Sequence, residues 1–142
     1  MPGGLFETWL VREQEIALGL QPVPAVNSHR LILCANSLWG GGATVADIEA
    51  TELSGYSRPV ITLPSQAEWD LIKKEGRLGT TVDIIHNGGN LVFDGIAWGI
   101  ESGGNLEHLI AGYRYPTPQT IYEDIPFKFK LNLINSFCGE TW

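Results

Sequence analysis

The side chains that most often carry out catalysis lie far apart in this sequence. The three histidines are His29, His86 and His108, and none belongs to a Gly-x-Ser-x-Gly nucleophile elbow or to a His-Glu-x-x-His helix. A hydrolase needs a nucleophile, an adjacent base and a group that orients the base, and the sequence offers no such set. Histidines on different strands can still converge on a zinc ion, but we interpret these three as structural. We therefore expect no enzyme, no metal site and no cofactor.

Acidic and glycine-rich segments also lack the spacing of known ligand sites. Asp47, Glu49 and Glu52 lie close together on a predicted helical turn, but without the Asp-x-Asp-x-Asp pattern that gives a calcium loop its oxygens. We interpret them as a solvated acidic face. The glycines at 40–42 lack the Gly-Lys-Ser/Thr that completes a phosphate-binding loop. Trp39, beside these glycines, is the tryptophan we expect to be exposed, and a carbohydrate-binding module that stacks sugar rings on Trp39 is one alternative function.

Composition limits the class of partner. The chain has 142 residues, a net charge of −7 and only 18% charged residues. Nucleic-acid binding needs a basic surface that displaces counterions from phosphates, so we expect no nucleic-acid partner. No apolar run approaches the roughly 20 residues that cross a bilayer, and the first residues lack the basic and apolar regions of a signal peptide. We therefore expect no membrane contact, and the few charges indicate surface that is buried in an assembly.

The two cysteines, Cys34 and Cys138, lie far apart and share no metal-type spacing. We interpret them as two buried free thiols, because cysteine behaves as a small buried hydrophobe. A disulfide between the first and last strands is the alternative.

The first 24 residues predict a helix followed by a stiff connector. Apolar side chains recur near helical spacing over residues 5–18, and Gly19 and the prolines at 22 and 24 end the helix. We therefore divide the chain into an N-terminal helix with its Pro-rich connector, residues 1–24, and a β-sandwich domain, residues 25–142. An apolar helix that proline holds away from the domain should lie in a groove of another chain. The candidate partner-binding residues are Phe6, Trp9, Leu10, Ile16 and Trp39.

Glycines and prolines divide the remaining chain into short segments typical of a β-rich fold. Capping boxes at Thr44 with Asp47 and at Ser65 with Glu68 predict short helices, the second over residues 66–75. We expect turns at 87–90, as a hairpin, and at 103–104, and strands at 30–35, 56–63, 80–86, 91–94, 96–101, 108–115 and 127–133. In the last strand, one face should meet the core through Phe127, Phe129, Leu131 and Leu133. We predict a mainly β, antiparallel sandwich of jelly-roll or immunoglobulin-like type, with an N-terminal amphipathic helix and one short inserted helix.

Residues 30–63 also carry a family pattern. The strand Leu-Ile-Leu-Cys-Ala-Asn at 31–36 precedes a glycine-rich spacer, an acidic Ala-Asp segment and a Gly-Tyr pair. This pattern resembles a family of small structural proteins of tailed bacteriophages, and the matching residues are Leu31, Leu33, Asn36, Ala46, Asp47, Gly55 and Tyr56. The resemblance covers about residues 5–135, since the N-terminal helix, Trp69, Gly99 and a proline before the last strand also fit.

The resemblance implies a β-sandwich component of a virion with no enzymatic activity. Its partners would be the major capsid protein or the tail proteins of the same particle. It would be a homo-oligomer, for which a trimer is our first expectation. We expect a capsid cement or decoration protein that stabilises contacts between capsid subunits, with a tail, baseplate or fibre-adaptor protein as the alternative. Either would be made in the host cytoplasm and located in the virion.

Overall fold

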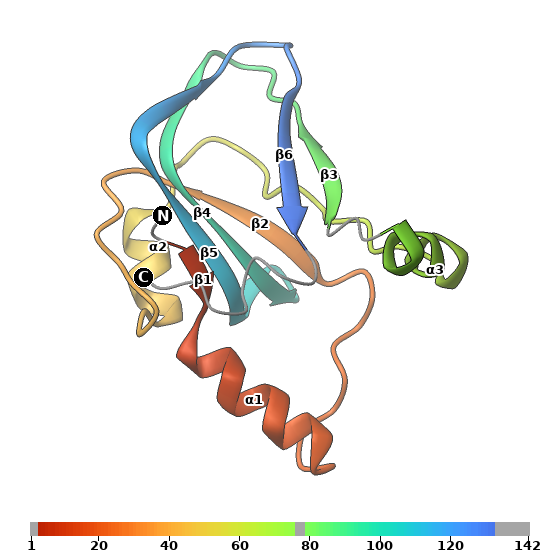
Figure 1. Ribbon diagram of the computed structural model, residues 1–142. Coiled ribbons are helices and arrows are strands. Elements are labelled where there is room, and N and C mark those ends of the chain that lie inside the picture. Colours follow the sequence, from red (N-terminus) through yellow and green to blue (C-terminus); the bar gives the residue numbers. More distant parts are fainter. Residues whose placement is uncertain (1–2, 76–78, 133–142) are drawn as a thin grey trace.

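Two antiparallel sheets and three helices make up the part of the chain that the computed structural model describes, residues 3–75 and 79–132 (Figure 1). The larger sheet has four strands in the order β1-β5-β4-β2, namely Gly3–Leu5, Asn105–Ile121, Leu91–Ser102 and His29–Cys34. The smaller sheet pairs β3, Gly79–Ile84, with β6, Phe127–Asn132. The predicted mainly β, antiparallel class is confirmed.

The long β4–β5 hairpin is the centre of the larger sheet. The turn that joins its strands is the predicted one, since Gly103 and Gly104 both have positive φ, 59° and 84°, and Ser102 pairs with Asn105. A two-residue turn with positive φ at both central residues matches the twist of the flanking strands, and glycine adopts positive φ without strain.

Both strands of this hairpin run further than the sequence predicts. β4 continues through residues 91–102 as one strand, because register shifts absorb the irregular positions. Pro116 and Pro118 lie inside β5, beyond residue 115 where we expected the strand to end. They lie within one of these register shifts, where Gln119 pairs with Phe93 and Arg114 pairs with Gly95. The β5 residues between these pairs outnumber the β4 residues opposite them, so a proline there need not donate a hydrogen bond to β4.

Two other predicted strand features are wrong. Residues 56–63 form no regular strand and contribute one isolated bridge, from Val60 to Arg30. The segment 87–90 is a bend with positive φ at Gly88 and Gly89, and not a hairpin turn, because β3 pairs with β6 and not with β4. Both β3 and β6 have one apolar face, through Val82 and Ile84 on β3, and pairing them places these faces on the same core.

Core residues lie on both faces of the larger sheet. Along β2, Leu31 and Leu33 belong to a core shared with β3 and β6, whereas Ile32 and Cys34 belong to a second core under α2. Alternate strand residues point to opposite faces, so a continuous apolar run is buried when both faces are covered. In β6, Leu131 is buried, the two phenylalanines are half-buried and the two lysines are exposed, as predicted. Leu133 and Cys138 lie outside the described residues.

The three helices are α1, Glu7–Ala17, α2, Val45–Thr51, and α3, Gln66–Glu75. Both predicted capping boxes are confirmed. In the first, the Thr44 hydroxyl accepts from the Asp47 amide at 3.3 Å and the Asp47 carboxylate accepts from the Thr44 amide at 2.9 Å. Ser65 and Glu68 make the equivalent pair before α3, at 3.2 and 3.4 Å.

The predicted division at residue 24 does not separate an arm from a sheet. β1 lies before α1 and pairs with β5, with Gly3 opposite Tyr113 and Leu5 opposite Ala111. Residues 3–5 are therefore one of the two edge strands of the larger sheet. α1 and its connector form an excursion between β1 and β2, and Figure 1 shows α1 at the end of the sheet, away from β3 and β6.

Candidate interaction surfaces

Two of the five predicted partner-binding residues, Phe6 and Trp39, are buried in the core of the chain. Phe6 is 0% exposed and Trp39 is 6% exposed, and their ring centroids lie 5.8 Å apart. The Trp39 indole also donates to the Thr51 hydroxyl at 3.2 Å. The prediction that Trp39 is exposed is wrong, because Phe6, immediately before α1, brings a ring against it. A buried indole has no face free for a sugar ring, so Trp39 cannot serve the carbohydrate-binding alternative.

The other three predicted residues lie on α1 with different exposure. Trp9 is half-buried and packs with Leu5 against a small core cluster beneath α1. Ile16 is half-buried, and Leu10 is 46% exposed. The structure therefore does not bring the five predicted residues together on one surface.

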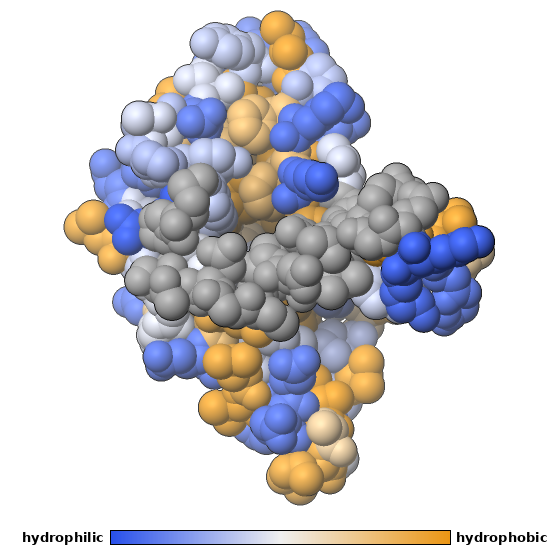
Figure 2. Space-filling model, in the orientation of Figure 1, coloured by the Kyte–Doolittle hydropathy of each residue, from blue (hydrophilic) through white to orange (hydrophobic). Residues whose placement is uncertain are grey.

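Exposed apolar side chains continue from α1 into the connector. We call this set the apolar arm: Leu10, Val11, Leu18, Leu20, Val23 and Val26, each between 46% and 78% exposed. Leu10, Val11 and Leu18 fall on one side of α1 at 3.6 residues per turn, away from Trp9 and Ile16. Figure 2 shows hydrophobic atoms at the end of the molecule where Figure 1 places α1. The sequence pattern placed Leu10 in one partner-binding stripe with Phe6, Trp9 and Ile16, and the second stripe formed by Leu10, Val11 and Leu18 was not predicted.

A nearly buried ionic cluster fixes the segment that follows α2 to the larger sheet. Arg58 binds both oxygens of Glu52 at 2.7 and 2.8 Å and one oxygen of Glu101 on β4 at 3.1 Å. The Tyr56 hydroxyl donates to Glu52 at 2.6 Å and accepts from the Leu33 amide at 2.9 Å. We call these residues the Arg58 cluster. It connects β2, β4 and the segment 52–58 through charge-assisted hydrogen bonds, which are stronger than neutral ones.

The pKa values in the Arg58 cluster follow from burial and pairing. Burial alone raises the pKa of Glu52, but hydrogen bonds from Arg58 and Tyr56 outweigh burial and hold it below its usual range. Burial and the Glu52 carboxylate raise the pKa of Tyr56, and the Glu52 hydrogen bond raises the pKa of Arg58. Tyr56 therefore stays protonated and the ion pair stays charged. Gly55, the residue before Tyr56, has φ of +75°, a conformation that favours glycine.

The Arg58 cluster gives the Gly-Tyr pair of the sequence pattern a structural role: Tyr56 binds Glu52 and the Leu33 amide, and Gly55 adopts the positive φ before it. The interpretation of Glu52 as part of a solvated acidic face is wrong, because its side chain is 15% exposed and paired with Arg58. The roles of Arg58 and Glu101 were not predicted. A usable signal was present, because Glu52, Tyr56 and Arg58 fall within seven positions of a chain with few charges.

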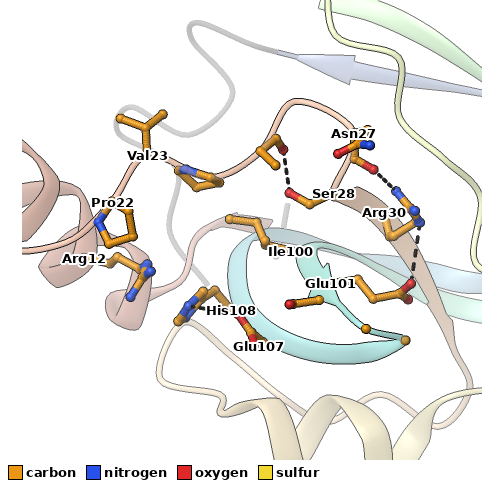
Figure 3. A pocket seen from close by; sticks show the side chains of 15 residues that line it. Arg12, Pro22, Val23, Asn27, Ser28, Arg30, Ile100, Glu101, Glu107 and His108 are labelled. Carbon is orange, nitrogen blue, oxygen red and sulfur yellow. Dashed lines mark hydrogen bonds and ion pairs between the residues drawn. The ribbon is translucent and has the colours of Figure 1, made fainter.

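A groove of about 520 Å³ lies between α1, the connector and the turn of the β4–β5 hairpin (Figure 3). Its charged lining comes from four elements: Arg12 on α1, Arg30 on β2, Glu101 on β4, and Glu107 with His108 on β5. Pro22 and Val23 of the connector form an apolar wall. Figure 3 shows Arg12 beside His108 at one end and Arg30 linked to Glu101 at the other.

His29 and Cys34 have structural environments. The Trp98 indole donates to Nδ1 of the buried His29 at 3.0 Å. Burial raises the pKa of Cys34 to about 12, so its thiol stays protonated and unreactive. Within residues 3–75 and 79–132, no group of three or more His, Cys, Asp or Glu side chains is placed to hold a metal ion. Over the same residues, no helix has the length and apolar character needed to cross a bilayer.

Comparisons with protein-family models, curated proteins and solved structures gave no match for this chain. An inference of function therefore depends on the described contacts and on the sequence pattern.

Proposed function

We propose that this chain is a non-enzymatic structural protein of a tailed-phage virion, in the first place a capsid cement or decoration protein. In this role it stabilises contacts between capsid subunits by binding the major capsid protein. The observation that carries the proposal is the apolar arm: six large apolar side chains are exposed on one excursion of a chain that otherwise has a well-formed core. Exposed apolar surface of this kind marks interaction sites.

The family pattern supports the same proposal through the roles of its residues. Leu31 and Leu33 are core residues, Asp47 caps α2 and Tyr56 joins the Arg58 cluster. These residues stabilise the fold, and a structural protein is expected to have residues with such roles in its family pattern. We further propose that the two sheets, which share one core cluster, are the layers of a small antiparallel sandwich. The described residues hold six strands, against seven or eight in immunoglobulin-like domains and jelly rolls.

Charge on α1 favours a different protein, and not a second copy, as the occupant of the apolar arm. The exposed charged residues of the helix, Glu7 and Glu13, are both acidic, and the chain carries a net charge of −7. Two such helices would repel each other, whereas an apolar groove with a basic rim would attract one. If the chain forms a homo-oligomer, for which we propose a trimer, other surfaces hold it together.

Quantitative mass spectrometry of particles purified from a lysed host culture tests the proposed function. A copy number comparable to that of the major capsid protein would place the chain on the head. A much lower copy number would place it in the tail or baseplate, and absence from particles would contradict a virion role.

Point substitutions test the apolar arm better than truncation does. Deleting residues 1–24 would remove Phe6 from the core and β1 from the sheet, so loss of binding would have two causes. Leu10→Asp and Leu18→Asp should leave the melting temperature nearly unchanged and abolish incorporation into particles. The matched control is Ile125→Asp, at a residue with 58% exposure outside the arm. Equal incorporation of all three variants would contradict the assigned surface.

A further inference from the structure

Arg12 forms no ion pair with any described residue of the groove in Figure 3, although Glu101 and Glu107 also line it. Its Nε is shielded from solvent and has no hydrogen-bond partner in the described part of the chain. The other groove arginine, Arg30, is satisfied, since it donates to the carbonyls of Asn27 and His29 at 2.7 and 3.0 Å and lies 3.8 Å from Glu101. A buried donor without an acceptor is unfavourable, so a ligand acceptor toward which the Arg12 guanidinium can turn would relieve it.

His108 adds a second donor next to Arg12. Its side chain is 29% exposed, and Figure 3 shows it beside the guanidinium. Burial, followed by the charge of Arg12, holds the pKa of His108 below its ordinary value. A neutral imidazole still carries one N–H that can donate to an acceptor. The Glu107 carboxylate lies 3.9 Å from Nε2 of His108 and is half exposed to solvent, so it competes only weakly with a ligand.

We propose that this groove binds a carboxylate, held by the guanidinium of Arg12 and the imidazole N–H of His108, with Pro22 and Val23 against the apolar part of the ligand. The planar guanidinium fork matches a carboxylate geometrically. Glu101 and Glu107 also line the groove, and they repel a phosphate dianion more strongly than a carboxylate monoanion. The carboxylate can come from an acidic side chain of a partner peptide or from a free organic acid.

Side-chain NMR of the full-length chain tests the proposal without any particle or partner protein. The Arg12 Nε–H and His108 ring signals are followed while sodium acetate, the capped tripeptide acetyl-Leu-Glu-Leu-amide, its Gln analogue or inorganic phosphate is added. Saturable shifts of both signals with the Glu peptide, and none with the Gln peptide, are expected. Tighter binding of the Glu peptide than of acetate identifies a peptide site, and equal binding identifies a free-acid site.

Substitutions separate this site from an unspecific charge effect. Arg12→Gln should weaken binding of the Glu peptide by about tenfold or more, since hydrogen bonds to charged groups are the strong ones. Arg12→Lys keeps the charge without the fork and should lose less. Glu107→Gln should tighten binding, and Lys130→Gln, an exposed cation on β6, should change nothing.

Three results would overturn the proposal: no saturable shift at Arg12 with either carboxylate, tighter binding of phosphate than of the Glu peptide, or unchanged binding by Arg12→Gln. The probes are small molecules, so these outcomes are independent of any virion role. No residue of α1 is fully buried, and unchanged backbone amide signals would show that each Arg12 variant is folded.

Discussion

Replacing Glu52 with glutamine should destabilise the chain substantially, because Glu52 neutralises the nearly buried Arg58. The substitution keeps the shape of the side chain and removes its charge. It weakens two charge-assisted hydrogen bonds from Arg58, at 2.7 and 2.8 Å, and one from Tyr56, at 2.6 Å. Of its two carboxylate partners, Arg58 then keeps only Glu101, at 3.1 Å.

The magnitude follows from the burial of the pair. Breaking a fully buried ion pair by removing one partner costs about 3–5 kcal/mol, and exposed pairs contribute about 0–1 kcal/mol. Glu52 and Arg58 are 15% and 17% exposed, which places them near the buried limit. Since Glu101 still neutralises part of the charge, we expect a loss of about 2–3 kcal/mol in the free energy of unfolding. In urea this corresponds to a fall of about 1–2 M in the unfolding midpoint with an unchanged m value.

The matched control is an exposed ion pair in the same chain. Lys128 lies 3.2 Å from Asp83, and the two side chains are 71% and 49% exposed. Lys128→Gln should therefore cost less than about 1 kcal/mol. In the double variant Glu52→Gln/Arg58→Met the losses should be smaller than additive, because the unpaired charge is removed as well. A midpoint for Glu52→Gln no lower than that for Lys128→Gln would refute the reasoning.

Three further predictions concern the core, a close approach and pH. Phe6→Ala should lower the free energy of unfolding in urea by about 3–5 kcal/mol because its site is fully buried. The exposed control Leu10→Ala should lower it by less than about 0.5 kcal/mol. Similar losses for the two variants would contradict the assignment of Phe6 to the core. Gly99→Ala should cost about 1–3 kcal/mol in thermal unfolding, since a Cβ there would lie 2.9 Å from a backbone carbonyl of β5. Gly42→Ala, with its nearest contact at 3.6 Å, should cost much less, and equal losses would contradict the steric argument. Burial holds the pKa of His29 below 6.5, so the unfolded chain binds more protons and stability falls as the pH is lowered through 6.5. His29→Gln should remove that part of the pH dependence, up to about 1.4 kcal/mol per pH unit, and an unchanged curve would contradict it.

Features that depend on neighbouring residues could be predicted from the sequence. Each capping box joins a hydroxyl and a carboxylate three positions apart, so Thr44 and Ser65 mark helix starts without any knowledge of the fold. The turn at 103–104 needs only two residues that tolerate positive φ. The alternation in β6 identifies which face meets a core, because strand geometry has a period of two.

Features that depend on distant residues were decided by the tertiary structure. Alternation tells which face of β3 is buried but not which strand lies beside it, and the pairing with β6 brings together residues that are about 50 positions apart. Phe6 and Trp39 were both predicted to bind a partner, yet their rings pack together and are buried. The two residues lie 33 positions apart in the sequence, so neither could be placed beside the other from local pattern. Periodicity also could not decide which of the two apolar sides of α1 faces the sheet.

The two candidate surfaces show the same division. The sequence by itself determined that α1 carries apolar residues and that glycine and proline follow it, whereas the strand β1 before the helix was not predicted. Only the tertiary structure decided that Leu10 is exposed while Phe6 is buried, and that Arg12 lies beside His108 with no carboxylate of residues 3–75 and 79–132 paired to it. The physical reason is that burial and charge pairing are properties of a packed neighbourhood, and chain closure brings those neighbours from α1, β4 and β5.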